Sequence, residues 1–258
     1  MTFKDYIIKK INKRKLKLLR KISPPPFKCR HSEYSLLSSL DDDPCKMSER
    51  LLNISLDAIK EAYKIDLSEI SQREPEEPNY PDVWPGEHYK LLTALVKTLK
   101  PKMVIEVGTA LGHSALALKK CLPEDSKLIT FDIFEWDSLE GTLLNNNDFS
   151  DGNLIQEIGD LSQDEVFYKY KNLISEADFI FIDAPKDIAF EREFLKKLDT
   201  VTFKNNPIIM FDDIRLWNML KIWRDIKRPK LDLTSFGHWS GTGLIDWNSE
   251  KDQENSIN

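Results

Sequence analysis

The regular alternation of strand and helix patterns after residue 87 limits most strongly what this chain can fold into. The segments VIEV, FIFID and IIMFD are almost continuously apolar, which is typical of strands covered on both faces. Strands that alternate with helices form a parallel sheet with helices on both sides. Strands are predicted over 102–107, 127–133, 153–158, 177–183 and 207–212, and helices over 87–100, 112–121, 162–174, 187–198 and 214–226.

Two late segments, 230–236 and 242–247, predict a closing antiparallel pair around GHWSGTG. The expected fold class is therefore α/β. We expect a Rossmann-like, doubly wound, mostly parallel seven-stranded sheet with an antiparallel C-terminal hairpin and an N-terminal helical extension. With 258 residues, of which 41% are hydrophobic, the chain can form one sizeable core.

Four regions are predicted along the chain. Residues 1–30 form a basic amphipathic arm, 31–85 a helical and extended lead-in, 86–248 the α/β domain and 249–258 a disordered tail. The arm has 11 Lys or Arg residues and one acid, Asp5. Residues 2–22 read as a helix that either contacts an anionic membrane surface or a partner, or is simply a solvated arm.

Composition narrows the partners and the compartment. Outside the arm the chain is acidic, which argues against nucleic-acid binding. Three scattered cysteines without a CxxC motif fit a reducing cytoplasm, with peripheral contact at the inner membrane face as an option for the arm. A homo-oligomer is left open by the sequence.

A glycine turn follows the first parallel strand in VIEVGTALGHS, residues 104–114. Gly108 allows a tight turn and close approach of a ligand, and Gly112 or Ser114 starts a helix whose amides favour polar groups. The spacing is not GxGxxG, so a dinucleotide fingerprint is absent. The second strand ends near Asp132, where an acid in such sheets binds ribose hydroxyls. A strand–helix turn without a ligand and a solvated Asp132 are the alternatives.

These two segments resemble motif I and its partner strand in class I S-adenosylmethionine-dependent methyltransferases. The resemblance covers about residues 84–247. It implies S-adenosyl-L-methionine as cofactor, with its methionine part against the glycine turn, its ribose at the second strand and its adenine after the third. The residues that match these roles are Glu106, Gly108, Thr109, Gly112, Ser114 and Asp132, with Gly159, Asp160 and Leu161 for the adenine.

Acids also end the fourth and fifth predicted strands. Asp183 is followed by Lys186 three residues later, and Asp212 is followed directly by Asp213. Neighbouring carboxylates repel one another, and a hard divalent cation such as Mg²⁺ relieves this repulsion, so Asp183, Asp212 and Asp213 are predicted metal ligands. The alternative is that Asp213 caps a helix beginning at 214 and that Asp183 is solvated.

The same pattern resembles the cation-dependent O-methyltransferases of the catechol and caffeoyl-CoA types. There a metal is held by an Asp at the fourth strand and an Asp-Asn at the fifth, and a Lys at the spacing of Lys186 can serve as base. Asp213 replaces the Asn here, as in macrocin-type sugar O-methyltransferases, and FDIFEW resembles that group too. The resemblance therefore implies methylation of a hydroxyl on a sugar, glycan or other small polar acceptor.

Two segments are candidates for the acceptor pocket. In DLTSFGHWSGTG, His238 is an alternative general base and Trp239 can stack on a sugar, although an ordinary glycine-rich hairpin is equally consistent. In PDVWPGEHY, Trp84, Glu87 and His88 could cover the site, but a structural role is favoured. The scatter of the four histidines does not suggest a zinc site.

Three other functions are weighed against this one. A nicotinamide-dependent oxidoreductase is disfavoured by the missing GxGxxG motif. A non-catalytic cofactor-binding or scaffold protein, docked by the basic arm, would use the acids only structurally. A methyltransferase without a metal would bind the cofactor but not a cation.

Overall fold

The computed structural model describes residues 45–74, 80–82 and 86–248, and the predictions for the basic arm, Trp84 and the C-terminal tail lie outside these residues. A seven-stranded sheet runs through this part of the chain in the order β3-β2-β1-β4-β5-β7-β6. Its strands are β1 (Met103–Val107), β2 (Lys127–Asp132), β3 (Leu154–Ile158), β4 (Phe179–Ile182), β5 (Ile208–Asp212), β6 (Lys230–Asp232) and β7 (Thr242–Asp246).

The predicted fold class is confirmed. Strands β1 to β5 pair in parallel, and β7 pairs antiparallel with both β5 and β6. The strand order changes direction beside β1, where β2 follows on one side and β4 on the other. In open sheets of this kind ligands bind beyond the carboxyl ends of the strands at such a point.

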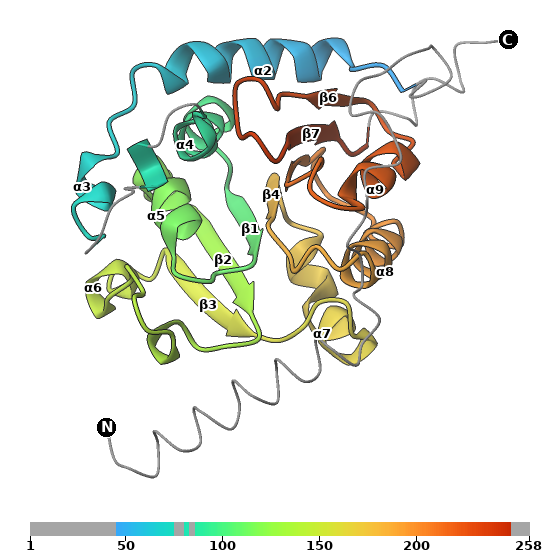
Figure 1. Ribbon diagram of the computed structural model, residues 1–258. Coiled ribbons are helices and arrows are strands. Elements are labelled where there is room, and N and C mark those ends of the chain that lie inside the picture. The colour runs from blue at the N-terminus through green and yellow to red at the C-terminus, as the bar shows by residue number, and fades with distance from the viewer. Residues whose placement is uncertain (1–44, 75–79, 83–85, 249–258) are drawn as a thin grey trace, which may run out of the picture.

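Helices cover both faces of the sheet (Figure 1). One face packs against α7 (Asp164–Ile174), α8 (Ala189–Leu198) and α9 (Met219–Asp225), and the other against α2 (Glu49–Ala62), α4 (His88–Leu99) and α5 (His113–Lys120). Short helices are α3 (Ser68–Ser71), α6 (Asn146–Phe149), η1 (Tyr80–Asp82) and η2 (Trp136–Ser138). None of the described helices has both the length and the apolar composition to span a bilayer.

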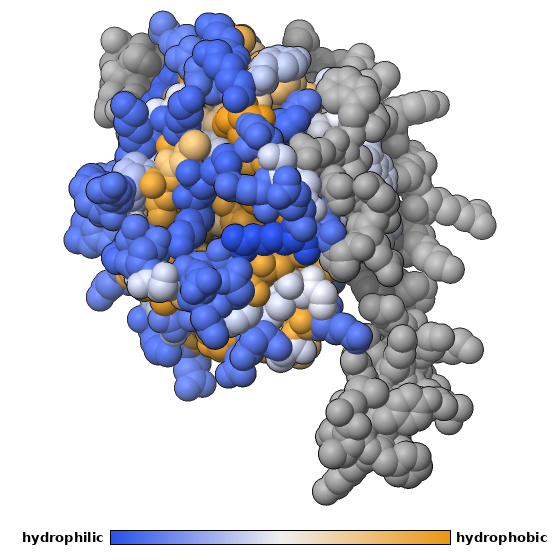
Figure 2. Space-filling model, turned by 90° about the vertical axis from the view of Figure 1, so that its left-hand side faces the viewer, coloured by the Kyte–Doolittle hydropathy of each residue, from blue (hydrophilic) through white to orange (hydrophobic). Residues whose placement is uncertain are grey.

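Side-chain alternation along the strands creates the two cores. Ile180 and Ile182 of β4 join the core under α7 to α9, whereas Phe179 and Phe181 join the core under α2, α4 and α5. The near-continuous apolar runs were therefore correctly interpreted as strands buried on both faces. The surface on the side shown in Figure 2 is mostly hydrophilic, with hydrophobic patches between charged side chains.

Two predicted elements are shorter than expected. The helix predicted from 214 begins only at Met219, because the backbone amide of Arg215 donates to the Ser240 carbonyl at 2.8 Å instead of entering a helix. Asp213 therefore does not cap a helix, and the helix-cap interpretation was wrong. The strand predicted over 230–236 ends at Asp232, whose side chain accepts the Thr234 amide in a turn.

Gly108 provides a test of the turn after β1. Its φ is +103°, and a Cβ there would lie 2.1 Å from the Asp183 carbonyl oxygen. We expect Gly108→Ala to lower the free energy of unfolding by about 3 kcal/mol, since it combines backbone strain with a backbone clash. Gly141→Ala is the control, because φ is +88° but no atom lies within 4 Å. Urea unfolding showing equal losses for both variants would contradict the crowding of β1 against β4.

Candidate functional site

The acids predicted to bind a metal meet at the carboxyl edge of the sheet. Asp183 follows β4, Asp212 ends β5, and these strands are direct neighbours. Asp213 has a left-handed φ of +56° and a side chain that is only 14% exposed. The fold therefore brings together three carboxylates separated by up to thirty residues of sequence.

Lys186 lies among these carboxylates. Its Nζ donates to Asp183 and lies 3.1 Å from Asp213 Oδ2 and 4.0 Å from Asp212 Oδ2. Burial by itself would lower the pKa of Lys186, but the charges of the three acids raise it above its ordinary value. A base must be neutral, so this environment, which favours the ammonium form, disfavours the base role predicted for Lys186.

Asp212 is the most deeply buried acid of the cluster. Its side chain is 8% exposed, and Oδ1 has no hydrogen-bond partner among the described residues. Burial, followed by the charges of Asp183 and Asp213, raises the pKa of Asp212 well above its ordinary value. A buried carboxylate oxygen without a partner is costly, and a bound cation relieves that cost.

His238 joins the cluster through strand pairing. Asp212 on β5 pairs with Thr242 on β7, so the turn before β7 lies over the end of β5. His238 Nδ1 lies 3.7 Å from Asp213 Oδ1 and hydrogen bonds with the Ser240 hydroxyl. Burial lowers the pKa of His238, although the charges of Asp213 and Asp183 oppose this, so the imidazole tends to be neutral.

His88 is a site residue whose place the sequence interpretation underestimated. Its ring lies 5.2 Å from that of His238, and Nδ1 is 3.6 Å from Asp212 Oδ1. Burial lowers the pKa of His88 to about 3, with the His238 and Lys186 charges adding to the effect. The wide spacing of the histidines along the sequence did not indicate that two of them are neighbours in space. They are brought together because the Glu87 amide donates to the Phe236 carbonyl at 2.9 Å.

The cluster has the donor set of a divalent-cation site. Asp212, Asp213 and His238 each offer a ligand atom, and these atoms lie within 4.8 Å of one another. Asp183 adds a third carboxylate from the neighbouring strand. Carboxylate oxygens suit Mg²⁺ and Mn²⁺, and the buried Asp212 Oδ1, which has no hydrogen-bond partner among the described residues, can serve as a ligand atom. The residues present therefore fit the predicted metal.

Glu106 lies on β1 below the glycine turn. It is fully buried, and neither carboxylate oxygen makes a hydrogen bond of ordinary geometry within the described residues. Burial raises the pKa of Glu106 to about 8, against the effect of the nearby Ser114 and Thr130 hydroxyls. A buried carboxylate of this kind fits a ligand that carries an ammonium group, as the methionine part of the predicted cofactor does.

The glycine turn is held partly by the protein itself. Gly112 has a φ of +90° and immediately precedes α5, and a Cβ there would lie 2.4 Å from Leu144 Cγ. The Thr109 hydroxyl lies 2.7 Å from that of Thr130 and accepts from Gln156 at 3.2 Å. A cofactor contact by Thr109 would therefore come from its backbone.

Asp132 lies at the end of β2 as predicted. Its two oxygens accept backbone amides from Ala110 at 2.9 Å, Ile133 at 2.7 Å and Phe134 at 3.1 Å. Because each carboxylate oxygen has two lone pairs, Asp132 Oδ2 can still accept from a ribose hydroxyl. Ile133 and Phe134 are 60% and 55% exposed, and an apolar pair beside the acid predicted to bind ribose suits a base such as adenine. The sequence analysis did not assign these two residues, although FDIF contained the signal.

Of the three residues predicted to contact the adenine, Gly159 and Leu161 can offer only backbone groups. Leu161 is 1% exposed within the core, and a Cβ on Gly159 would lie 2.6 Å from Val166. Only their backbone groups are therefore suited to contact a ligand. The Asp160 carboxylate accepts from the Ser162 amide at 2.8 Å and from the Gln163 side chain at 3.2 Å.

The two tryptophans near the C-terminal hairpin have opposite environments. Trp239 is 74% exposed beside His238, with ring centroids 5.9 Å apart, whereas Trp247 is buried in the core. Trp239 is thus free to contact an acceptor.

His113 is not directed at open solvent, since its ring contacts the Glu74 carboxylate and is 13% exposed.

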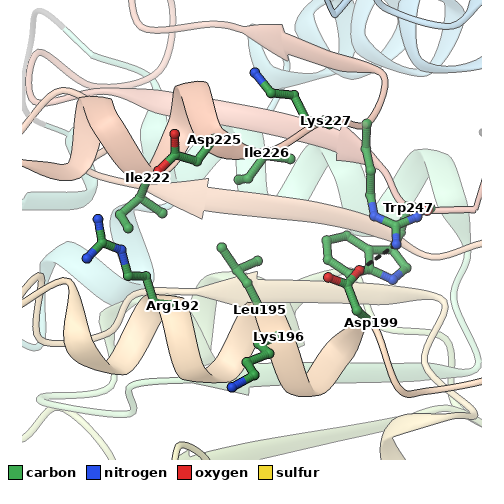
Figure 3. A pocket seen from close by; sticks show the side chains of 10 residues that line it. Arg192, Leu195, Lys196, Asp199, Ile222, Asp225, Ile226, Lys227 and Trp247 are labelled. Carbon is green, nitrogen blue, oxygen red and sulfur yellow. Dashed lines mark hydrogen bonds and ion pairs between the residues drawn. The ribbon is translucent and has the colours of Figure 1, made fainter.

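A hollow of about 410 Å³ lies between α8 and α9 (Figure 3). Leu195, Ile222 and Trp247 contribute apolar lining, and Arg228 pairs with Asp199 at 2.6 Å. None of the predicted site residues lines this hollow.

The sequence of this chain is similar to those of known O-methyltransferases. A family model described as O-methyltransferase matches residues 60–233. Caffeoyl-CoA O-methyltransferase 2 of Petunia hybrida is 26% identical over 73% of this chain and 75% of its own length, and caffeoyl-CoA O-methyltransferase of Medicago sativa is 27% identical over 73% of each. An SAH-bound methyltransferase from Podospora anserina superposes with a TM-score of 0.45, 15% identity and coverage of 76% of this chain and 88% of its own, a loose superposition that adds nothing to the family match.

The buried Glu106 predicts a specific pH dependence of stability. Between its ordinary pKa of 4.5 and its folded value of about 8, the folded protein keeps a proton that the unfolded chain releases. This contribution is fully present below about pH 4.5 and is lost, at up to about 1.4 kcal/mol per pH unit, as the pH rises through 8.

Glu106→Gln remains neutral at every pH, so it serves as the reference. We expect the variant to gain stability relative to the unmodified chain as the pH rises from about 5 to about 8. Urea unfolding of both proteins without cofactor measures this difference. A difference that does not change with pH would show that Glu106 is not the buried, protonated group described here.

Proposed function

This chain belongs to the O-methyltransferase family and is an S-adenosylmethionine-dependent methyltransferase, and we propose that it needs a divalent cation and methylates a hydroxyl group of a small polar acceptor such as a sugar. The observation that carries the proposal is the cluster of Asp212, Asp213 and His238, whose ligand atoms lie within 4.8 Å of one another, with Asp183 at the end of the neighbouring strand. The buried Asp212 Oδ1 has no hydrogen-bond partner among the described residues, and such a group costs free energy unless a ligand pairs with it.

The cofactor is assigned to the carboxyl ends of β1 and β2. When bound, S-adenosylmethionine supplies an electrophilic methyl group. Glu106 would hold the ammonium of its methionine part, and Asp132 would accept from the ribose hydroxyls. Ile133 and Phe134 supply apolar surface to the adenine. These residues bind and orient the cofactor, and none of them is assigned a role in proton transfer.

The divalent cation is assigned to the carboxylates of Asp183, Asp212 and Asp213. A cation held by these residues would supply Lewis acidity, which makes an acceptor hydroxyl a better nucleophile. Lys186 contributes a positive charge to the same cluster.

His238 is the better candidate for the base. Its neutral imidazole can accept a proton, whereas Lys186 is held as an ammonium ion by the surrounding acids. His238 is 34% exposed, so an acceptor can reach it, and Asp213 Oδ1 at 3.7 Å stabilises the positive charge that it gains. The exposed indole of Trp239 next to it offers a flat apolar surface for a sugar ring.

A metal-independent methyltransferase is the second candidate, because Lys186 already neutralises part of the acidic cluster. The relatives from Petunia hybrida and Medicago sativa are named for caffeoyl-CoA, so a phenolic acceptor is the main alternative to a sugar. A cytoplasmic location, membrane contact through residues 2–22 and homo-oligomer formation remain predictions, and those residues lie outside the described part of the chain.

Calorimetric titration tests the two halves of the site. S-adenosylhomocysteine is expected to bind the protein both in the presence of Mg²⁺ and in the presence of EDTA. The affinity for Mg²⁺ is expected to fall at least about tenfold in Asp212→Asn, since one charged ligand is lost. Asp225→Asn, an exposed acid on α9, is the matched control. Cofactor binding without any Mg²⁺ site would support the metal-independent alternative.

Activity of His238 variants tests the proposed base. We expect His238→Asn to slow methyl transfer by about 10²- to 10⁴-fold, the usual contribution of a general base, while S-adenosylhomocysteine binds as before. The assay screens sugars first and phenols second, with labelled cofactor. If Lys186→Met abolishes transfer and His238→Asn does not, the base assignment is wrong.

A further inference from the structure

The loop between β4 and α8 has an unusual backbone. Lys186 and Ile188 have φ values of +60° and +71°, in the left-handed region that favours glycine. For a β-branched residue such as Ile188 this conformation is a clear outlier. Each such residue costs about 1–3 kcal/mol and persists only where the surroundings enforce it.

Glu191 enforces this loop from inside the protein. It lies in the first turn of α8 and is 1% exposed, and its Oε1 accepts from the Lys186 backbone amide at 2.8 Å. Its other oxygen, Oε2, has no hydrogen-bond partner among the described residues. A buried carboxylate is expensive to maintain, and this one lies against the backbone of the loop, where the amides of Lys186, Ile188 and Glu191 itself oppose the cost of its burial.

The backbone of Lys186 determines where its side chain points. From this loop the ammonium reaches Asp183, Asp213 and the edge of Asp212, with only 12% of the side chain exposed. The second anchor of the loop, the Asp187 side chain, accepts the Phe190 amide at 2.9 Å and so orients α8. Glu191 is the contact that acts on Lys186 itself.

We propose that Glu191 is a positioning residue that holds the Lys186 backbone in its left-handed conformation and thereby keeps the Lys186 ammonium among the three acids, where it limits the affinity of the site for a divalent cation. This inference rests on the cation site proposed above. Like charges compete for the same carboxylates, so a displaced ammonium leaves a more negative site that binds a cation more tightly.

The test measures Mn²⁺ binding by the full-length protein, with S-adenosylhomocysteine present, from the electron paramagnetic resonance signal of free Mn²⁺. We expect Glu191→Ala and Lys186→Met each to tighten Mn²⁺ binding about tenfold. The double variant should bind no more tightly than Lys186→Met alone, because Glu191 acts through Lys186. Glu191→Gln keeps an acceptor oxygen and should bind Mn²⁺ as the unmodified chain does.

Glu193→Ala is the matched control. This acid lies two residues further along the same helix, is 53% exposed and lies 3.9 Å from Lys196, so its loss should leave Mn²⁺ binding unchanged. Thermal unfolding, measured in parallel, separates a loss of stability from a change at the site, and Glu191→Gln supplies the comparison if the alanine variant does not fold.

The outcomes distinguish this inference from the function on which it rests. If neither the unmodified chain nor Lys186→Met binds Mn²⁺, the proposed cation site is wrong and the inference is overturned with it. If both bind and Glu191→Ala changes only the unfolding temperature, or adds fully to Lys186→Met, the role of Glu191 alone is wrong. Tight binding by Glu191→Gln, equal to that of the alanine variant, would also overturn it.

Discussion

Electrostatic repulsion at the carboxyl edge of the sheet is the constraint around which this site is organised. Asp183, Asp212 and Asp213 lie at neighbouring strand ends, and burial, followed by the charges of the other two, raises the pKa of Asp212. Coulomb energies between such groups amount to several kcal/mol in a partly buried environment, so a positive charge placed among them is stabilising. Lys186 supplies one positive charge, and the proposed divalent cation supplies the rest.

The backbone around this cluster carries unfavourable geometry that serves the site. Asp213, Lys186 and Ile188 all have left-handed φ values, and Gly108 lies against the Asp183 carbonyl oxygen where no side chain fits. Such conformations concentrate at functional sites because surrounding packing enforces them. The two cores on either side of the sheet provide that packing, and Glu191 adds a direct hydrogen bond.

Most of the fold could be predicted because its signals are local. Strands β1, β2 and β5 begin and end within a few residues of their predicted bounds, since continuous apolar runs and flanking turn residues mark them. They end at Val107, Asp132 and Asp212. The start of α9 could not be predicted, because a long-range hydrogen bond from Arg215 to Ser240 replaces the first helical turn. Long-range contacts of this kind leave no local pattern.

The amino-acid sequence predicts the alternation of strands and helices, the order of the acids along the chain and the residues of the glycine turn, because each depends on neighbours within one element. The fold was needed to show that His88 and His238 lie beside the acids, that Lys186 is surrounded by three carboxylates and that Glu191 faces the Lys186 backbone. These contacts depend on which strand ends become neighbours, and on the burial that shifts their pKa values. Neither property exists until the sheet has formed and excluded water from its edge.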